Sequence, residues 1–355
     1  MDKKWLDNML LYAMKENASS LHLISGVPPA MRINGNMKYT DYDKVNKQRM
    51  EELIEWFVSK ENSNILSEKG SCDFTYSIEK TNRFRVNIYR QRGSYSIIIK
   101  IGSLYVQSKE MLNLPNCIYT LSNLKSGLVI INGLSSSGRT STATFIVDQI
   151  RQTHNGHIIT IENPIEFLFK HDQCIISQKE VGLDVKSFEA GLEAAVYQDA
   201  DVIYISELKS VKCINKVLDI AQSGKLVIAV MNTKDVSDTL QLLMNSSDNV
   251  NSNWNRLQIA NCLKGILSQK LLPTTVNSTI PAFEILLQTT AVSNLIRENK
   301  LSQIPTVIEN SINLGMTTFN KSIARLFHKG IITKDTALSS VYETNDMLNK
   351  LVIER

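Results

Sequence analysis

Residues 127–140 read GLVIINGLSSSGRT, and this stretch decides the fold. Its first six residues form an apolar run typical of a buried parallel strand. The next eight match the spacing G-x-x-x-x-G-K-[ST], except that Arg139 stands where the pattern has lysine. From Thr142 to Ile150, apolar residues recur with the spacing of one helix face. A loop of glycine and serine between a strand and a helix predicts a phosphate-binding loop, whereas the same loop alone would indicate a linker.

In such a loop, glycines allow backbone N–H groups to close around phosphate oxygens, and the hydroxyl after the basic residue binds Mg²⁺. Arginine presents a bulky planar guanidinium where lysine would present a compact ammonium to the β- and γ-phosphates. Because a helix N-terminus binds anions even without lysine, we expect nucleotide binding to survive this exchange. The predicted binding residues are Gly133, Ser135, Ser136, Ser137, Gly138, Arg139, Thr140 and Ser141, and Thr140 is also a predicted Mg²⁺ ligand.

The composition is that of a folded protein with two domains of ordinary size. The chain has 355 residues, of which 43% are hydrophobic, and its net charge is +4. The sequence has no dense Lys/Arg block, so nucleic-acid binding has little support. It has no apolar run of spanning length, and polar residues interrupt its start, which favours an amphipathic helix over a signal peptide. The five cysteines form no C-x-x-C pair, which argues against a zinc site or a disulfide framework and favours a reducing cytoplasm.

Before the loop, the pattern predicts a mixed α/β domain. Residues 31–37 alternate about an Asn-Gly pair, which is a strong hairpin signal. Residues 83–89 and 95–101 alternate in the same way and predict two further strands. Residues 102–116 mix Gly, Ser, Lys and Pro, so the domain boundary is expected there.

After the loop, strands and helices alternate. Apolar runs at residues 157–161, 202–206 and 226–231 are separated by helical patterns, which predicts a parallel sheet with helices on both faces. Beyond about residue 285 the pattern is helical throughout, and Gly330 is predicted to end the helix that carries Phe319 and Ile323.

Two acidic residues, Glu162 and Glu207, follow apolar runs at the predicted carboxyl ends of strands. Ligands of open parallel sheets bind outside these ends, so either carboxylate could orient the attacking water or hold the Mg²⁺ shell. Acids are also common in loops after strands, but two beside a phosphate loop favour function. Arg83 and Arg85 share one face of their strand. They are either a solvated pair or arginines supplied to the γ-phosphate across an interface.

Seven parts of the sequence together carry a resemblance to a known family: Leu21–Leu23, Gly26–Pro29, Arg83–Val86, the phosphate loop, Thr160–Glu166, Glu207 and Ala291–Lys300. They resemble the type IV pilus retraction ATPases, a branch of the secretion-type P-loop ATPases. Within that family, residues 178–184 and Asn345-Asp346 resemble the accessory retraction paralogue most.

The resemblance implies an α/β protein with a PAS-like N-terminal domain (1–105), a linker (106–116), a RecA-like P-loop ATPase core (117–284) and a C-terminal helical part (285–355). It implies an ATP hydrolase with ATP and Mg²⁺ as cofactors. Its catalytic residues would be Glu162, Glu207, Arg83 and Arg85, and Glu207 would also face the metal. The chain would act in the cytoplasm, peripheral to the inner face of the membrane. It would form a homo-hexamer or a mixed assembly with a related retraction ATPase, docked on an inner-membrane pilus platform protein.

Several positions depart from the pattern of that family, and they cluster around the nucleotide. They are Arg139, Asn163, Tyr197, Ser206, Lys209, Lys225 and Asn232. Asn232 replaces a histidine and cannot relay a proton as histidine does. The departures predict weakened hydrolysis, and they leave open a non-hydrolysing scaffold that supports a partner retraction ATPase. A pilus assembly or type II secretion ATPase is a further alternative, although such relatives usually carry a four-cysteine zinc module.

Overall fold

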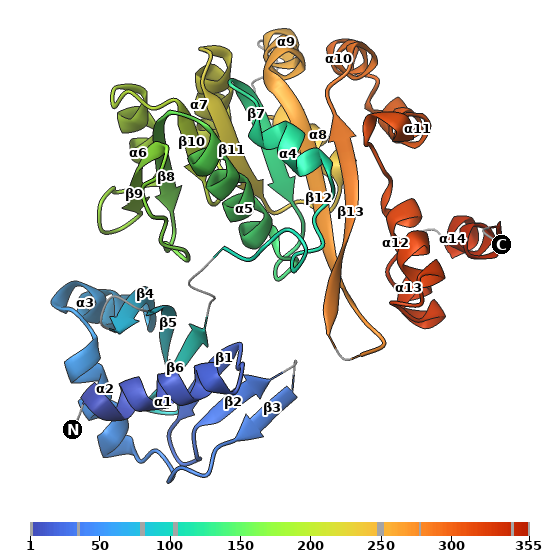
Figure 1. The fold of residues 1–355 in the computed structure, drawn as a ribbon. Coiled ribbons are helices and arrows are strands. Elements are labelled where there is room, and N and C mark those ends of the chain that lie inside the picture. The colour runs from blue at the N-terminus through green and yellow to red at the C-terminus, as the bar shows by residue number, and fades with distance from the viewer. Residues whose placement is uncertain are drawn as a thin grey trace. The chain divides into compact units, whose positions relative to one another are not determined.

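A computed structural model describes residues 3–33, 36–78, 82–101, 106–246, 252–276, 278–341 and 344–353. The chain forms two compact units (Figure 1). Unit 1 consists of Met1–Tyr105 together with the short segment Pro164–Leu168, and unit 2 consists of Val106–Asn163 and Phe169–Arg355. The sequence does not indicate that residues 164–168, which follow the Glu162 strand, belong with unit 1.

Unit 1 contains a six-stranded sheet with the order β3-β2-β1-β6-β5-β4, in which every neighbouring pair is antiparallel. The predicted hairpin strands are present and pair Ile33 with Asn36, while Asn34 and Gly35 lie outside the described residues. The elements are α1 (Lys3–Lys15), β1 (Ser20–Ile24), β2 (Ala30–Ile33), β3 (Asn36–Tyr39), α2 (Lys47–Phe57), α3 (Lys60–Lys69), β4 (Ser71–Ile78), β5 (Asn82–Gln91) and β6 (Ser94–Ile101).

Alternation along β5 and β6 builds the core of unit 1. Phe84, Val86 and Ile88 are buried on β5, and Ile97 and Ile99 are buried on β6. Because successive side chains of a strand point to opposite faces, these residues cover one face of the sheet, where they pack in one cluster with residues of α1. The strands predicted at 83–89 and 95–101 are therefore confirmed.

Unit 2 is built on a seven-stranded sheet with the order β13-β12-β7-β11-β10-β8-β9, in which only β13 runs antiparallel to its neighbour. Three of these strands, β9, β12 and β13, are missing from the sequence prediction. The strands are β7 (Gly127–Asn132), β8 (Gly156–Glu162), β9 (Cys174–Glu180), β10 (Val202–Ile205), β11 (Leu226–Met231), β12 (Leu263–Pro273) and β13 (Thr279–Leu287).

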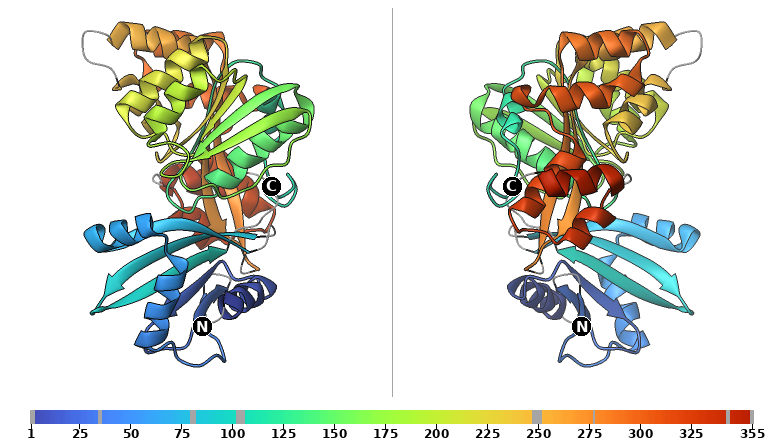
Figure 2. Two further views of the ribbon diagram at one scale, coloured as in Figure 1. Left: turned by 90° about the vertical axis from the view of Figure 1, so that its left-hand side faces the viewer. Right: turned by 90° about the vertical axis from the view of Figure 1, so that its right-hand side faces the viewer.

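Helices cover both faces of this sheet, as the views in Figure 1 and Figure 2 show. The strands are buried on both sides: Leu128 and Ile130 of β7 pack in one hydrophobic cluster, and Val129 and Ile131 pack in another. The cluster with Val129 includes residues of α4 (Cys117–Ser122) and α5 (Arg139–Thr153). The opposite cluster includes residues of α6 (Phe188–Val196), α7 (Val211–Gln222), α8 (Val236–Met244), α9 (Ser252–Cys262), α10 (Thr290–Arg297) and α11 (Ile304–Asn310). The predicted α/β class with a doubly covered parallel sheet is confirmed.

After β13 the described chain is helical, as predicted. Gly330 has a positive φ of 68° two residues after α12 ends, which is the left-handed conformation that glycine adopts at low cost. The remaining elements are α12 (Phe319–His328), α13 (Lys334–Ser339), α14 (Thr344–Ile353) and the short 3₁₀ turns η2 (Leu301–Gln303) and η3 (Ile312–Leu314).

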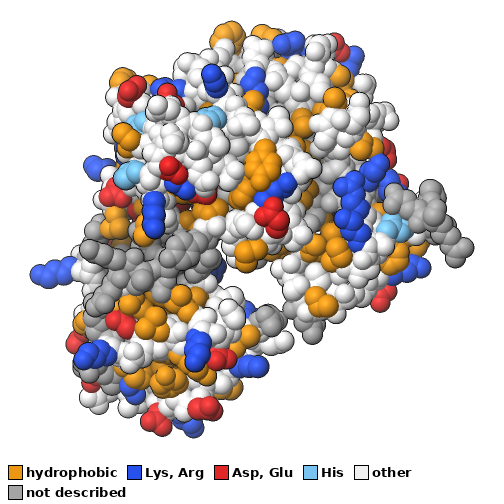
Figure 3. All heavy atoms as spheres, in the orientation of Figure 1, with side chains coloured by type: hydrophobic (Ala, Val, Ile, Leu, Met, Phe, Trp, Pro, Cys, Tyr) orange, Lys and Arg blue, Asp and Glu red, His pale blue; other side chains and the backbone are white. Residues whose placement is uncertain are grey.

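Among the described residues, no helix combines the length and the apolar character needed to cross a membrane. On the face of the molecule drawn in Figure 3, basic and acidic side chains are interspersed. This mixture agrees with the mild net charge of +4.

Candidate functional site

The phosphate loop lies where the motif requires it, between a buried strand and a helix. All six residues of β7 are buried, and α5 begins at Arg139. Gly133 and Gly138 have positive φ values of 156° and 86°, and Gly138 is the N-cap of α5. Ser136 also has a positive φ, 64°, which is uncommon for a residue with a side chain. The loop therefore folds back tightly on itself before the helix starts.

Both loop glycines face Gln269 of β12. A Cβ atom at Gly133 would overlap the backbone carbonyl oxygen of Gln269, and one at Gly138 would lie 2.7 Å from its side-chain Nε2. A larger residue at Gly133 would therefore clash with the backbone of β12, whereas one at Gly138 would have to displace the end of the Gln269 side chain, and both would also strain a positive φ. The motif's two glycines are thus explained by a strand that the sequence analysis missed.

The first turn of α5 supplies the groups that could bind phosphate. The first N–H groups of a helix have no partner within the helix, and their dipoles favour an anion. Thr140 and Ser141 lie in this turn and are half-buried, while Ser135 and Ser136 are exposed and Ser137 is buried. The predicted binding residues thus form one continuous loop and helix start.

A cavity of about 350 Å³ lies beside this loop within unit 2. Its wall is made by the loop, by β12 and by the end of α13 with the residues that follow it. The lining residues are Leu134–Ser137, Gln269–Leu272 and Ser339–Val341.

Arg139 reaches across to the end of β11. Its Nη1 donates a hydrogen bond to the carbonyl oxygen of Met231 at 2.5 Å and to Oδ1 of Asn232 at 3.4 Å. Burial lowers the pKa of the guanidinium, and the nearby charge of Glu207 opposes this shift. The side chain that replaces the motif's lysine therefore ties α5 to the neighbouring strand of the sheet.

The sheet order ranks the predicted polar residues by their distance from the loop. Neighbouring strands lie about 4.8 Å apart, so β11, β10 and β8 lie roughly 5, 10 and 14 Å from β7. Asn232 follows β11, Glu207 follows β10 and Glu162 ends β8. Asn232 and Glu207 are therefore better placed to face a nucleotide than Glu162.

Glu162 is fully buried. Its Oε1 accepts a hydrogen bond from Thr160 Oγ1 at 2.6 Å and another from Gln178 Nε2, on β9, at 3.2 Å. In this arrangement the carboxylate holds β8 to β9. Both of these hydrogen bonds end on Oε1 of the carboxylate.

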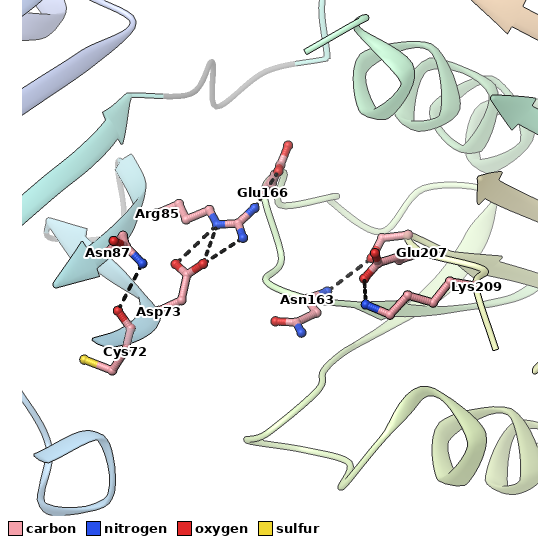
Figure 4. Close-up of polar contacts among 9 residues, drawn as sticks. Cys72, Asp73, Arg85, Asn87, Asn163, Glu166, Glu207 and Lys209 are labelled. Atoms are coloured by element: carbon pink, nitrogen blue, oxygen red, sulfur yellow. Dashed lines mark hydrogen bonds and ion pairs between the residues drawn. The ribbon is translucent and has the colours of Figure 1, made fainter. Parts of the chain in front are cut away.

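Glu207 lies just beyond β10 and is partly exposed, with 42% of its side chain accessible. Its Oε2 lies 3.2 Å from Nζ of Lys209 (Figure 4). The residue before Glu207, Ser206, accepts a hydrogen bond at Oγ from the backbone N–H of Asn163 at 3.1 Å. An exposed ion pair of this kind contributes little to stability, so Glu207 is easily released for another partner.

The residues present fit a Mg²⁺ ion held largely by water and phosphate. Mg²⁺ takes hard oxygen ligands and is usually bound through one or two protein groups plus substrate phosphates. Thr140 supplies a hydroxyl and Glu207 a carboxylate. Among the described residues, no group of three or more His, Cys, Asp or Glu could form a metal cage by itself.

The two predicted arginines lie on β5 of unit 1. The side chain of Arg83 is outside the described part of the structure. Arg85 donates from Nη2 to Asp73 Oδ2 at 2.7 Å, and its Nη1 lies 3.8 Å from Oε1 of Glu166 (Figure 4). Burial raises the pKa of Glu166, and the charges of Arg85 and Lys100 oppose that shift. Arg85 therefore binds two carboxylates of its own unit in this structure.

Sequence reasoning missed a second polar group beside the loop, at the end of β7. Asn132 is fully buried and donates from Nδ2 to the carbonyl oxygens of Thr233 and Asp235, at 3.3 and 3.2 Å. Its Oδ1 accepts from Ser268 Oγ at 2.8 Å. The available signal was an asparagine that directly follows an apolar run. These bonds fix the loop between β11 and α8 against the start of the phosphate loop.

The strand–loop–helix geometry defines a nucleotide-binding protein of the P-loop class, and comparisons with known proteins define its family. Residues 90–312 match the family described as Type II/IV secretion system protein. The chain therefore belongs to this family of secretion-type P-loop ATPases.

Individual relatives match along nearly the whole chain. The chain is 33% identical to the uncharacterized protein YggR of Escherichia coli, over 89% of this chain and 96% of YggR. It is 28% identical to the type IV pilus ATPase PilU of Pseudomonas aeruginosa, over 96% of this chain and 90% of PilU. The crystal structure of the pilus retraction motor PilT with bound ADP superposes with a TM-score of 0.88 at 32% identity, and covers 96% of this chain and 98% of that one. These matches confirm the RecA-like ATPase fold.

One further carboxyl group, that of Glu284 on β13, lies beside the start of α8. Its Oε2 accepts a hydrogen bond from the backbone N–H of Val236 at 2.8 Å. Burial raises the pKa of Glu284 to about 7; Val236 N–H and the charge of Lys270 oppose the shift, and Asp235 adds to it. Asn132, at the end of β7, bonds the carbonyl oxygen of Asp235, so Asn132 and Glu284 bond neighbouring residues of the connection between β11 and α8.

The raised pKa predicts that stability depends on pH. The native state keeps the Glu284 proton up to about pH 7, whereas the unfolded chain loses it near 4.5. The stabilisation is therefore complete below pH 4.5 and is lost as the pH rises towards 7. We expect this group to raise the unfolding equilibrium constant by up to tenfold per pH unit across that window. Glu284→Gln keeps an oxygen for Val236 and should remove this slope in urea denaturation at several pH values.

The control is Glu193→Gln, which changes an exposed glutamate of the same unit. An unchanged slope in Glu284→Gln, or an equal loss of slope in both variants, would contradict the assignment.

Proposed function

We propose that this protein is a type IV pilus retraction ATPase subunit, which binds ATP and Mg²⁺ and acts in twitching motility as a hexameric ring at the pilus base. The phosphate loop carries this proposal, because its glycine geometry and its place between β7 and α5 are those of a nucleotide site. The likeness to the pilus retraction motor PilT with bound ADP, over nearly the whole chain, supports the retraction role.

In the proposed mechanism, backbone N–H groups from Gly133 to Thr140 bind the phosphates. Thr140 and Glu207 hold the shell of the Mg²⁺, which would neutralise phosphate charge when bound. Glu207 also orients the attacking water. Glu162, on the more distant strand β8, is the second carboxylate that would polarise this water. Arg83 and Arg85 of the N-terminal domain stabilise the γ-phosphate, and Arg85 must leave Asp73 to do so.

We further propose that hydrolysis by this chain alone is slow. The Arg139 guanidinium is bonded to β11, while a lysine would present its charge to the β- and γ-phosphates. Removing one preorganised charge stabiliser typically costs about 10²–10³ in rate. Asn232 adds to this loss because its amide cannot accept and relay a proton. The chain would then resemble the accessory retraction paralogue more than the main motor.

The second candidate function is a non-hydrolysing accessory subunit that binds nucleotide weakly and supports a partner retraction ATPase. The hydrogen bond between Arg139 and Met231 favours this second candidate. It engages the only basic side chain of the loop, which in the usual motif contacts the β- and γ-phosphates. A pilus assembly or type II secretion ATPase, built on the same core, is the third candidate.

The proposed partners follow from the same likeness. They are further copies of this chain or a related retraction ATPase, together with an inner-membrane pilus platform protein. We propose that the N-terminal domain (1–105) and the ATPase domain (117–355) move relative to each other during turnover. The protein would work in the cytoplasm, at the inner face of the membrane, without binding nucleic acid.

Arg139→Lys tests whether the rest of the site is competent. The compact ammonium should reach the β- and γ-phosphates, so we expect steady-state ATP hydrolysis by the purified protein to rise by roughly tenfold or more. The assay is run with and without a related active ATPase, and the Kd for ATP is measured in parallel. An unchanged rate at unchanged nucleotide affinity would mean that the other departures have already disabled the chemistry.

Glu207→Gln distinguishes a motor from an accessory subunit in cells. The substitution keeps the side-chain volume and removes the charge that would organise water and Mg²⁺. If a partner ATPase supplies most of the force, the hydrolysis that Glu207 would support matters little, and we expect twitching to fall by less than about twofold at equal protein levels. A folding defect is not expected, because substitutions at solvent-exposed groups usually change stability little. Complete loss of retraction with intact ring assembly would show that this chain is itself the motor.

A further inference from the structure

Gln269 lies behind the phosphate loop and is only 3% exposed. In the parallel register of β12 with β7, Ser268 pairs with Asn132, the last residue of β7. Gln269 is therefore the first residue of β12 beyond the end of β7, level with the loop. Because successive side chains of a strand alternate between faces, the side chains of Ser268 and Gln269 point to opposite faces of the sheet. Ser268 bonds Asn132, and Gln269 faces the loop and α5.

Three different groups of Gln269 contact the loop and its helix. Its backbone carbonyl abuts Gly133, and its Nε2 abuts Gly138. Its Oε1 accepts a hydrogen bond from Thr142 Oγ1 at 2.6 Å. One residue thus contacts both ends of the phosphate loop and the first turn of α5.

The bond between Thr142 and Gln269 is buried and joins two elements 127 residues apart. Thr142 is 1% exposed, and its hydroxyl donates to β12. Thr144, two residues further along the same helix, donates to carbonyl oxygens of its own helix, those of Thr140 and Ser141. Removing one partner of a buried bond leaves the other unsatisfied, which costs more than the bond itself contributes.

We propose that Gln269 and Thr142 are positioning residues for nucleotide binding. They fix the N-terminus of α5 relative to β12, so that its N–H groups point to where the phosphates bind. This inference rests on the proposed nucleotide binding. We assign neither side chain a catalytic role, because the Thr142 hydroxyl and the Gln269 amide oxygen are bonded to each other. Their contribution is preorganisation: donors already fixed in direction bind an anion more tightly than donors that must first be ordered.

Thr142→Val tests the inference, because it keeps the shape of the side chain and removes the donor. We expect the Kd for ADP with Mg²⁺, measured by calorimetry, to rise roughly tenfold, because the N–H donors of the loosened loop must first be ordered before they bind phosphate. Hydrogen exchange at residues 133–141 without nucleotide should accelerate in the same variant. Thr142→Ser, which keeps the hydroxyl, should stay within about twofold of wild type in both measurements.

The matched control is Thr144→Val, which removes an equally buried hydroxyl of the same helix whose hydrogen bonds go to that helix and not to Gln269. Its ADP affinity should stay within about twofold of wild type. Equal losses in Thr142→Val and Thr144→Val, or wild-type affinity and exchange in Thr142→Val, would overturn the inference. If wild type binds no ADP but the loop loosens only in Thr142→Val, nucleotide binding fails as the function while the positioning of the loop stands.

Discussion

The close packing of β12 against the phosphate loop is the constraint on which the rest of the site depends. A Cβ atom at Gly133 would clash with the Gln269 carbonyl, and one at Gly138 would displace the end of the Gln269 side chain; both positions also have a positive φ, which favours glycine. The same residue fixes the first turn of α5 through Thr142. The direction of the helix, and with it the direction of its free N–H groups, follows from these contacts.

A second set of bonds holds the neighbouring connection between β11 and α8. Asn132 bonds two carbonyl oxygens of this connection, Glu284 bonds the first N–H of α8, and Arg139 bonds the last carbonyl of β11. The positively charged side chain of the loop is thus part of a structural network at the carboxyl ends of the strands. In this arrangement the site keeps the backbone shape of a phosphate loop while the charge at position 139 is bonded to β11. The backbone geometry depends on glycine and Gln269, and only the placement of charge depends on the residue at position 139.

Much of the fold could be predicted from the sequence because its signals are local. The apolar run before the loop and the alternation in residues 83–101 both depend on neighbouring residues, and both predictions were confirmed. The strands β9 and β12 were missed because polar residues such as Gln178 and Gln269 interrupt their apolar pattern, although these residues are hydrogen-bonded in the structure.

The loop residues of the site were found from a motif, whereas Gln269 and Glu284 act through contacts between distant segments that no local pattern encodes. The roles predicted for Glu162, Glu207, Arg83 and Arg85 stay predictions.

The central claim is that the backbone of the phosphate loop, and not the side chain of Arg139, binds the nucleotide phosphates. The most direct test is a crystal structure of this protein with ADP and Mg²⁺. The account predicts the β-phosphate within hydrogen-bond distance of N–H groups between Ser135 and Thr140, with the Arg139 guanidinium still bonded to the carbonyl of Met231. A β-phosphate bound chiefly by the guanidinium of Arg139, or a nucleotide bound away from this loop, would contradict it.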